Sequence, residues 1–379
     1  MKIKFPDGVY KLKADPLPIR KPKKAFNRVA FAAAHVVADA LANADPSGPP
    51  ALDWEKTLAY RRYLLDLGFG IAEAMDTSQR GMGLDWPRAL ELITRSLDEA
   101  GPRAGRIFSG CGTDQLDPAA ARNTGDVVKA YLEQLHAIQK RGGRIILMAS
   151  RALVRVAKSP DDYVKVYSRV LSEADHPVIL HWLGDMFDPA LKGYWGGNDF
   201  APAMETCLTA IAANSKKVDG IKISLLDDGK EITMRRRLPK GVKMYTGDDF
   251  NYPALIAGDA QGYSDALLGI FDAIAPAASA GLAALARGDM KKYAALMEPT
   301  VPLSRLIFRA PTQYYKTGIV FLAWLNGHQD HFVMVGGAQA MRPLPYFTEV
   351  FKLADQARLL SDPELAVKRM KTLLAMYGA

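Results

Sequence analysis

Short apolar runs alternate with longer amphipathic stretches along most of this chain, starting near residue 28. Eight of these runs are almost continuously apolar and often follow a glycine or a charged turn, which is typical of strands buried on both faces. We predict strands within residues 28–37, 68–75, 105–112, 143–150, 176–183, 218–226, 242–247 and 264–271.

Between the strands, apolar residues recur with the 3.6-residue period of a helix. The segments 53–68 and 85–101 each open on an aspartate that can cap a helix and end at a glycine. Residues 123–143 and 159–176 show the same pattern. Strand and helix therefore alternate, which predicts an α/β protein with a parallel (β/α)8 TIM barrel. An open doubly wound sheet is the weaker alternative, because no glycine-rich phosphate loop follows the first strand.

The pattern changes after Pro276, where only helical segments follow. The last helix of a barrel cannot account for all of them, so we expect an additional C-terminal helical region. The first residues resemble an extension that wraps around the outside. The predicted organisation is an N-terminal extension (1–27), a (β/α)8 barrel (28–300) and a C-terminal helical region (301–379).

The composition, 49% hydrophobic and 24% charged, is that of an ordinary soluble globular protein. The net charge of +8 includes the clusters "RKPKK" and "MRRR", which lack interleaved aromatic residues or a recognisable nucleic-acid-binding module. We expect a solvated surface without a nucleic-acid partner, although a basic rim can also attract an anionic small substrate. Neither a membrane span nor a secretory signal is evident. Two cysteines, Cys111 and Cys207, favour a reducing cytoplasm.

The run "VDGIKISLL", residues 218–226, places Lys222 among apolar and β-branched residues. A lysine is rarely buried without a partner, and desolvation lowers its pKa towards the free amine. A free amine at neutral pH is what Schiff-base chemistry with a carbonyl substrate requires. The alternative is a lysine at a strand end that reaches solvent.

Taken in order, several motifs resemble the dihydrodipicolinate synthase / N-acetylneuraminate lyase superfamily of class I aldolases and lyases. "HPVILHWLG" and "VDGIKIS" are similar to its fifth and sixth strands, with Lys222 at the Schiff-base position, and "MYTGDDFNYPALIAGD" to the passage after its seventh strand. "RIFSGCGTD" resembles the end of its third strand, including Gly110 and Gly112. The resemblance covers about residues 28–375. It implies a TIM barrel that forms an imine on a small-molecule carbonyl substrate, without a cofactor, as a homodimer or homotetramer.

The sequence also departs from that family. The G-T-T-G-E loop that holds the substrate carboxylate aligns with "MDTSQ", where only Thr77 matches. The proton-relaying tyrosine of the fifth strand aligns with His181, and the tyrosine pair after the fourth strand aligns near Ser150 and Arg151. We therefore expect a divergent branch. An imidazole titrates near neutrality and can take over proton transfer, although a core histidine is the alternative. Arg151 is expected either to clamp a carboxylate or to pair with a rim aspartate.

The active site of such a barrel lies at the C-terminal ends of its strands. We predict a lyase, aldolase or hydro-lyase acting on a small keto acid or a sugar-derived keto compound, with Lys222 and His181 as the catalytic residues. Asp248 and Asp249, after the seventh strand, also fit a structural role in their loop. The substrate-binding candidates are Thr77, Asp76, Arg151, Gly110, Gly112 and Asp248.

Two other functions use the same barrel differently. In the first, His35, Glu73 or Asp76, and His181 converge on Zn²⁺ or another divalent ion that polarises the carbonyl, and Lys222 is a charged helper. In the second, the barrel is not catalytic and binds a ligand, because the carboxylate loop and the tyrosines are missing. A bound metal, a trapped imine or neither would separate the three hypotheses.

Overall fold

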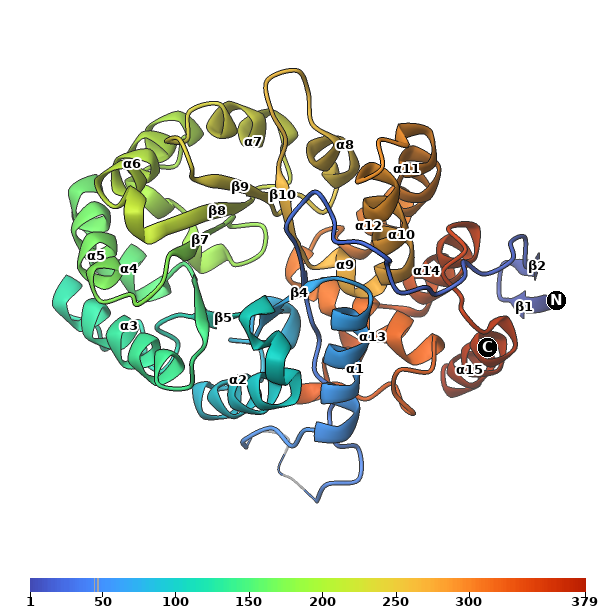
Figure 1. Cartoon of the computed structure of the whole chain (residues 1–379). Helices are drawn as coiled ribbons and strands as arrows, with labels where there is room; N and C mark the ends of the chain where they lie inside the picture. Colours follow the sequence, from blue (N-terminus) through green and yellow to red (C-terminus); the bar gives the residue numbers. More distant parts are fainter. Residues whose placement is uncertain (44, 46–47) are drawn as a thin grey trace.

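The computed structural model describes residues 1–43, 45 and 48–379, and eight parallel strands at its centre close into a barrel (Figure 1). The strand order is β10-β3-β4-β5-β6-β7-β8-β9, and β10 closes the barrel against β3. Each strand lies inside one of the eight predicted runs, so the predicted (β/α)8 barrel is confirmed. The barrel strands are β3 (Ala30–Ala33), β4 (Gly70–Glu73), β5 (Ile107–Cys111), β6 (Arg144–Leu147), β7 (Val178–Leu183), β8 (Val218–Ser224), β9 (Lys243–Thr246) and β10 (Asp265–Leu268).

Helices surround the barrel, and the two with predicted aspartate caps begin at those residues. The Asp53 carboxylate accepts a hydrogen bond from the Lys56 N–H, and Asp85 does the same for the Arg88 N–H. These side chains satisfy backbone donors that have no partner within the helix. The helices in this layer are α1 (Trp54–Asp66), α2 (Trp86–Ala100), α3 (Thr124–Gln139), α4 (Arg151–Val156), α5 (Pro160–Ser172), α6 (Phe200–Ala213), α7 (Asp228–Arg235), α8 (Tyr252–Ala257), α9 (Ile270–Ala273) and α10 (Ala275–Leu285).

Further helices follow the barrel, and the two ends of the chain lie on the same side of the molecule (Figure 1). These helices are α11 (Met290–Met297), α12 (Val301–Ile307), α13 (Tyr315–Leu325), α14 (Leu344–Gln356) and α15 (Pro363–Met376). An N-terminal hairpin of β1 (Lys2–Phe5) and β2 (Gly8–Lys11) packs on α14, where the Tyr10 hydroxyl donates to Asp355 at 2.7 Å. Every residue of α13 is buried. Across the described residues, no helix has the length and apolarity needed to cross a membrane.

The pleat of the strands decides which side chains enter the barrel. Phe31, Ala72, Phe108 and Ile179 are among the residues that pack together inside it. Residues two positions further along each strand face the same way, so His181 follows Ile179 into the interior. Residues one position away face the helices instead.

Glu73 is one of these outward-facing residues, and it joins β4 to two helices. Its carboxylate accepts hydrogen bonds from the Arg61 guanidinium of α1 at 2.8 and 2.9 Å and from the Ser96 hydroxyl of α2 at 2.6 Å. Both partners of the ion pair are almost fully buried. The carboxylate is therefore a structural anchor between the barrel wall and its helices.

Replacing this carboxylate should destabilise the fold strongly. In Glu73→Gln, the Arg61 guanidinium remains buried without a counter-charge, and we expect the free energy of unfolding to fall by about 3–5 kcal/mol. Urea denaturation followed by circular dichroism measures the loss. Glu91→Gln is the control, because it breaks only surface ion pairs with Arg88 and Arg95 and should cost less than about 1 kcal/mol. Equal effects of the two substitutions would contradict the anchoring role.

Candidate active site

Lys222 lies inside the barrel towards its C-terminal end, and its side chain is only 7% exposed. Nowhere in the described part of the chain does its amine have a hydrogen-bond partner. Burial lowers the pKa of Lys222 from its ordinary value, while the carboxylates of Asp249 and Asp76 act in the opposite direction. The result is an amine that loses its proton more readily than a surface lysine does.

His181 is the neighbour of Lys222 on the adjacent strand, since the two residues are Cα partners in the β7–β8 register. The imidazole is 1% exposed, and its Nε2 lies 3.2 Å from the Ser224 hydroxyl. Its buried Nδ1 has no hydrogen-bond partner among the described residues. Burial and the Lys222 charge hold the pKa of His181 well below its usual value. The expectation that this imidazole titrates near neutrality is therefore wrong, and it is neutral at physiological pH.

The turn after β9 brings a carboxylate to Lys222. Burial raises the pKa of Asp249 to about 7, the Lys222 charge opposes this rise, and one carboxylate oxygen accepts the Ile270 N–H at 2.9 Å. A glycine is needed at position 247, because a Cβ there would lie 2.5 Å from the Ile223 carbonyl oxygen and 2.8 Å from Lys222 Cε. The close approach of this turn is what places Asp249 near the amine.

Asp248, next to it, has a different role. Its carboxylate accepts hydrogen bonds from the backbone N–H groups of Phe250 and Asn251 at 2.8 and 3.1 Å and from the Asn251 side chain at 2.9 Å. These bonds shape the loop before α8 and occupy the carboxylate. The prediction that Asp248 binds substrate is not supported by this geometry, whereas its structural role in the loop is.

The "MDTSQ" loop forms a single helical turn, Asp76–Ser78, at the end of β4. Asp76 lines a cavity at the barrel mouth, whereas Thr77 is buried behind it and lies 2.8 Å from the Tyr315 hydroxyl of α13. The next residue of α13, Lys316, is also buried. Burial lowers the pKa of Lys316 to about 8, although Asp76 raises it. The C-terminal region thus supplies a second buried amine with a lowered pKa near the mouth.

Sequence reasoning missed Tyr315 and Lys316. The available signal was the same as for Lys222, namely a lysine next to the apolar run "TGIVFLAWL". The expectation of a helix in this C-terminal region is confirmed by α13. Only the tertiary arrangement shows that its first turn reaches the barrel mouth.

The cavity at the mouth has a volume of about 280 Å³, and charged side chains form much of its wall. Arg151 donates to Asp188 at 2.6 Å. It therefore pairs with a rim aspartate, which is one of its two predicted roles. Arg80 donates to both carboxylate oxygens of Asp114 at 2.6 and 2.9 Å. His181 also lines this cavity. The wall therefore presents ion pairs in which each guanidinium already has a carboxylate.

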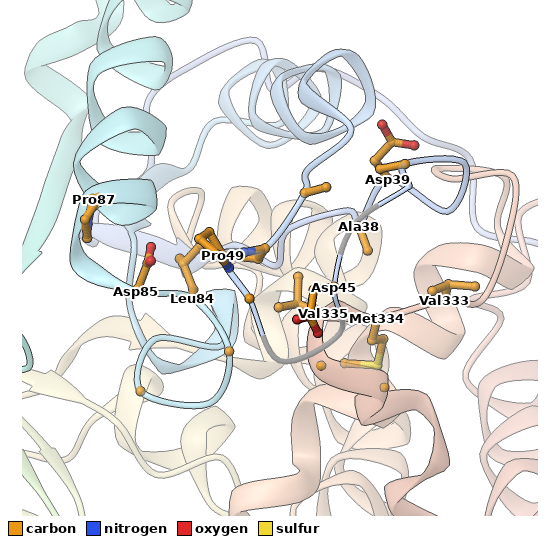
Figure 2. A pocket seen from close by; sticks show the side chains of 18 of the residues that line it. Ala38, Asp39, Asp45, Pro49, Leu84, Asp85, Pro87, Val333, Met334 and Val335 are labelled. Carbon is orange, nitrogen blue, oxygen red and sulfur yellow. The ribbon is translucent and has the colours of Figure 1, made fainter.

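A larger cavity of about 890 Å³ adjoins the first, since Gly81 and Asp114 line both. Figure 2 shows its opposite walls, with Ala38 and Asp39 on one segment and Val333, Met334 and Val335 on another. The mouth of the barrel is thus continuous with a wider, more apolar groove.

The two predicted glycines at the end of β5 are used differently. A Cβ at Gly110 would lie 2.7 Å from the Ala74 carbonyl oxygen and 2.8 Å from Met148 Sδ, so glycine is required there by close packing. Gly112 lines the cavity, and its N–H donates to the Gln134 side chain at 2.7 Å. Of the two, only Gly112 is placed to touch a ligand.

The side chains proposed as metal ligands do not come together. Strand β3 ends at Ala33, and the His35 ring lies outside the barrel, 2.8 Å from Asp272 and against Tyr60 of α1. Glu73 faces the helices, whereas His181 faces the interior. Within residues 1–43, 45 and 48–379, no three His, Cys, Asp or Glu side chains form a group that could hold a metal ion. The prediction of a joint site is wrong, because His35 and Glu73 lie on the outer side of the barrel wall.

The architecture is that of a dihydrodipicolinate synthase-like barrel. The prophage protein YagE from E. coli K12, of the dihydrodipicolinic acid synthase family and in complex with pyruvate, matches with a TM-score of 0.68 and 16% identity over 88% of this chain and 100% of its own. Dihydrodipicolinate synthase from Aquifex aeolicus matches with a TM-score of 0.65 and 13% identity over 88% of this chain and 99% of its own. At such identities the likeness shows the fold, which confirms the predicted resemblance at that level.

The family itself follows from the sequence. The family model "Protein of unknown function (DUF993)" matches residues 7–379, so this chain belongs to that family. No curated protein matches the sequence. The chain is thus a divergent branch with a dihydrodipicolinate synthase-like fold.

The buried amine should reduce the stability of the fold. Lys222→Met keeps the shape but removes the amine, and we expect the free energy of unfolding to rise by about 1–3 kcal/mol. Since the pKa of Lys222 is lower in the folded chain than its ordinary 10.5, the unfolded chain binds the extra proton. The gain should be largest below the lowered pKa and should shrink as the pH approaches 10.5. Urea denaturation at several pH values measures it.

Lys240→Met, which alters an exposed lysine, is the control and should change the stability little at any pH. A gain in stability of the same size in both variants, or one independent of pH, would show that the buried Lys222 amine does not destabilise the fold.

Proposed function

We propose that this protein is a class I lyase or aldolase that forms an imine between Lys222 and a small carbonyl compound. The observation that carries the proposal is the buried Lys222 amine, which has a lowered pKa and no hydrogen-bond partner among the described residues. It lies at the end of the barrel where active sites of this fold are found. The imidazole beside it lines a cavity of suitable size for a small ligand.

In the proposed reaction, Lys222 Nζ attacks the substrate carbonyl carbon, and loss of water gives the imine. The imine accepts the electron pair released when a bond at the neighbouring carbon breaks. Asp249, with a pKa of about 7, is the group that exchanges a proton with the Lys222 amine. In an aldolase, the bond that breaks is the C–C bond at the neighbouring carbon. In a hydro-lyase, the imine instead accepts the electron pair of the C–H bond at this carbon, and the enamine so formed expels the hydroxyl group of the next carbon, which leaves as water.

His181 is proposed to exchange a proton with the substrate as a neutral imidazole. In the tautomer whose Nε2–H donates to the Ser224 hydroxyl, Nδ1 presents a lone pair that no described residue uses. This role differs from the predicted one only in protonation state. The low pKa keeps His181 uncharged in the resting site, and it makes the imidazolium that forms when Nδ1 accepts a proton return that proton readily.

The charges of the cavity favour one of the two predicted substrate classes. Arg80 and Arg151 are each paired with an aspartate, and Asp76 adds a further carboxylate. The carboxylate of a small keto acid would have to compete with these aspartates. A sugar-derived keto compound, with hydroxyl groups that donate to carboxylates and accept from guanidinium groups, fits this wall better. Thr77 would act indirectly, because its hydrogen bond with Tyr315 would hold the loop that carries Asp76.

Borohydride trapping tests the imine directly. The protein is incubated with pyruvate and with a panel of keto sugars, reduced, digested and analysed by mass spectrometry. We expect a secondary-amine adduct on the Lys222 peptide, strongest with a keto sugar, and its complete loss in Lys222→Met.

Lys316→Met is the matched control, because Lys316 is the other buried amine with a lowered pKa, and the adduct on Lys222 should persist in this variant. An adduct that forms on Lys316 instead would move the chemistry to α13. Absence of any adduct while a keto sugar still binds would favour the ligand-binding barrel.

The pH dependence of trapping tests the role of Asp249. Only the free amine attacks a carbonyl, so the rate should rise with pH through the lowered pKa of Lys222. The Asp249 carboxylate raises that pKa, and its removal should lower it further. In Asp249→Asn the rise should therefore occur at lower pH. Asp248 lies in the same turn but holds the loop, so Asp248→Asn should leave the pH midpoint of trapping unchanged. A shift of equal size in both variants would contradict the role proposed for Asp249.

A further inference from the structure

A third cavity lies at the opposite end of the barrel from Lys222. Its volume is about 590 Å³, which is within the range of small-molecule sites. The N-terminal segment 22–31 forms one wall, and Arg144 and Lys243, the first residues of β6 and β9, contribute to another. The proposed carbonyl chemistry uses none of these residues.

Positive charge dominates this cavity. Its cationic lining residues are Lys23, Lys24, Arg28, Arg106, Arg144 and Lys243, and its acidic ones are Asp66 and Asp219. Both acidic residues already have partners. Asp219 accepts from Lys243 at 2.8 Å and from the Tyr245 hydroxyl at 2.6 Å, while Asp66 pairs with Lys21 and Arg103 outside the lining.

The remaining five cations have no carboxylate within ion-pair distance in the described part of the structure. Like charges gathered in one concave site repel each other, and an anion bound there would relieve this repulsion. The cavity therefore has the charge expected of an anion site.

Two of these cations are held in place by the backbone. Arg106 donates to the Phe69 carbonyl at 2.6 Å, and Arg28 donates to the Ile256 carbonyl at 2.9 Å. Both guanidinium groups are partly buried, and neither is free to swing into solvent. All three nitrogens of Arg28 donate to backbone carbonyls, so Arg28 contributes mainly a fixed positive charge. Arg106 is fixed in the same way by the Phe69 and Leu65 carbonyls, which lowers the entropy cost of binding an anion beside it.

Aromatic rings line the same cavity. Phe31 and Phe108 pack with ring centroids 4.9 Å apart, and the Arg144 guanidinium lies 5.4 Å from the Phe108 centroid. Phe26 also contributes to the wall. Phe31 and Phe108 are almost fully buried, so they close the cavity towards the barrel interior, whereas Phe26 is only partly buried. Cations around an apolar floor suit a ligand with phosphoryl groups and an apolar body.

We propose that this cavity binds a phosphorylated small molecule. The site depends on phosphoryl oxygens meeting Lys23, Lys24 and Arg144, whose charges are unpaired. A concave cavity with organised donors favours a compact ligand over an extended polyanion. The phosphoryl chemistry is shared by inorganic polyphosphates and by nucleotides, and two probes distinguish these sources.

Isothermal titration calorimetry with inorganic pyrophosphate and with ADP tests the site in the full-length protein. We expect saturable binding of about one equivalent, which weakens as NaCl is added because ions screen the charges. Tighter binding of ADP, by about tenfold, would identify an aromatic phosphorylated ligand that uses the rings. Equal affinities would identify the phosphoryl groups alone as the ligand. No saturable binding of either probe would overturn the proposal.

Paired variants locate the site. Lys24→Gln with Arg144→Gln should weaken binding of the probe at least tenfold. Lys240→Gln with Lys291→Gln removes the same charge from exposed positions outside the cavity and should have little effect. Equal weakening by both pairs would show non-specific attraction and overturn the proposal. Binding retained in Lys222→Met would confirm that the probe does not occupy the barrel mouth.

Discussion

An ammonium group inside a barrel loses the hydration that stabilises its charge, and the parts of the chain around Lys222 reflect that cost. Asp249 and Asp76 supply nearby negative charge without forming a hydrogen bond to the amine. The turn after β9 approaches closely because position 247 carries no side chain. His181 responds to the same environment by staying neutral. One arrangement results from the strand register, the turn after β9 and the loop after β4. In it, nearby carboxylates offset only part of the cost of burying the Lys222 charge.

The polar residues on the two sides of the barrel wall differ in how completely they are paired. Outside, both carboxylate oxygens of Glu73 have partners, since they accept from Arg61 and Ser96. These bonds fix two helices against a strand and leave neither oxygen free for a ligand. Inside, the Lys222 amine and the His181 Nδ1 lack partners among the described residues. The Glu73 cluster thus belongs to the scaffold, whereas the Lys222 amine and the His181 Nδ1 are where a ligand would find an unused donor and an unused acceptor.

The sequence predicted the barrel well because strands buried on both faces leave continuous apolar runs, and because aspartate caps mark where helices begin. Lys222 and His181 were also placed correctly in the interior, on neighbouring strands. The predictions for Glu73 and His35 were wrong because they required the phase of the pleat and the last residue of β3, which apolar runs do not reveal. Lys316 was missed because its position depends on how α13 packs. The domain boundaries, the homo-oligomer and the cytoplasmic location stay predictions.

The hydrogen bond between Thr77 and Tyr315 joins residues 238 positions apart in the chain. A ribosome makes the loop after β4 long before it makes α13, so the loop waits without this partner through most of synthesis. Contacts of such sequence separation form late, because a long loop must close first. The barrel wall can therefore assemble while the chain is still emerging, but its mouth takes its final form only once nearly the whole chain is present. The loop that carries Asp76 therefore gains this anchor only in the last stage of synthesis.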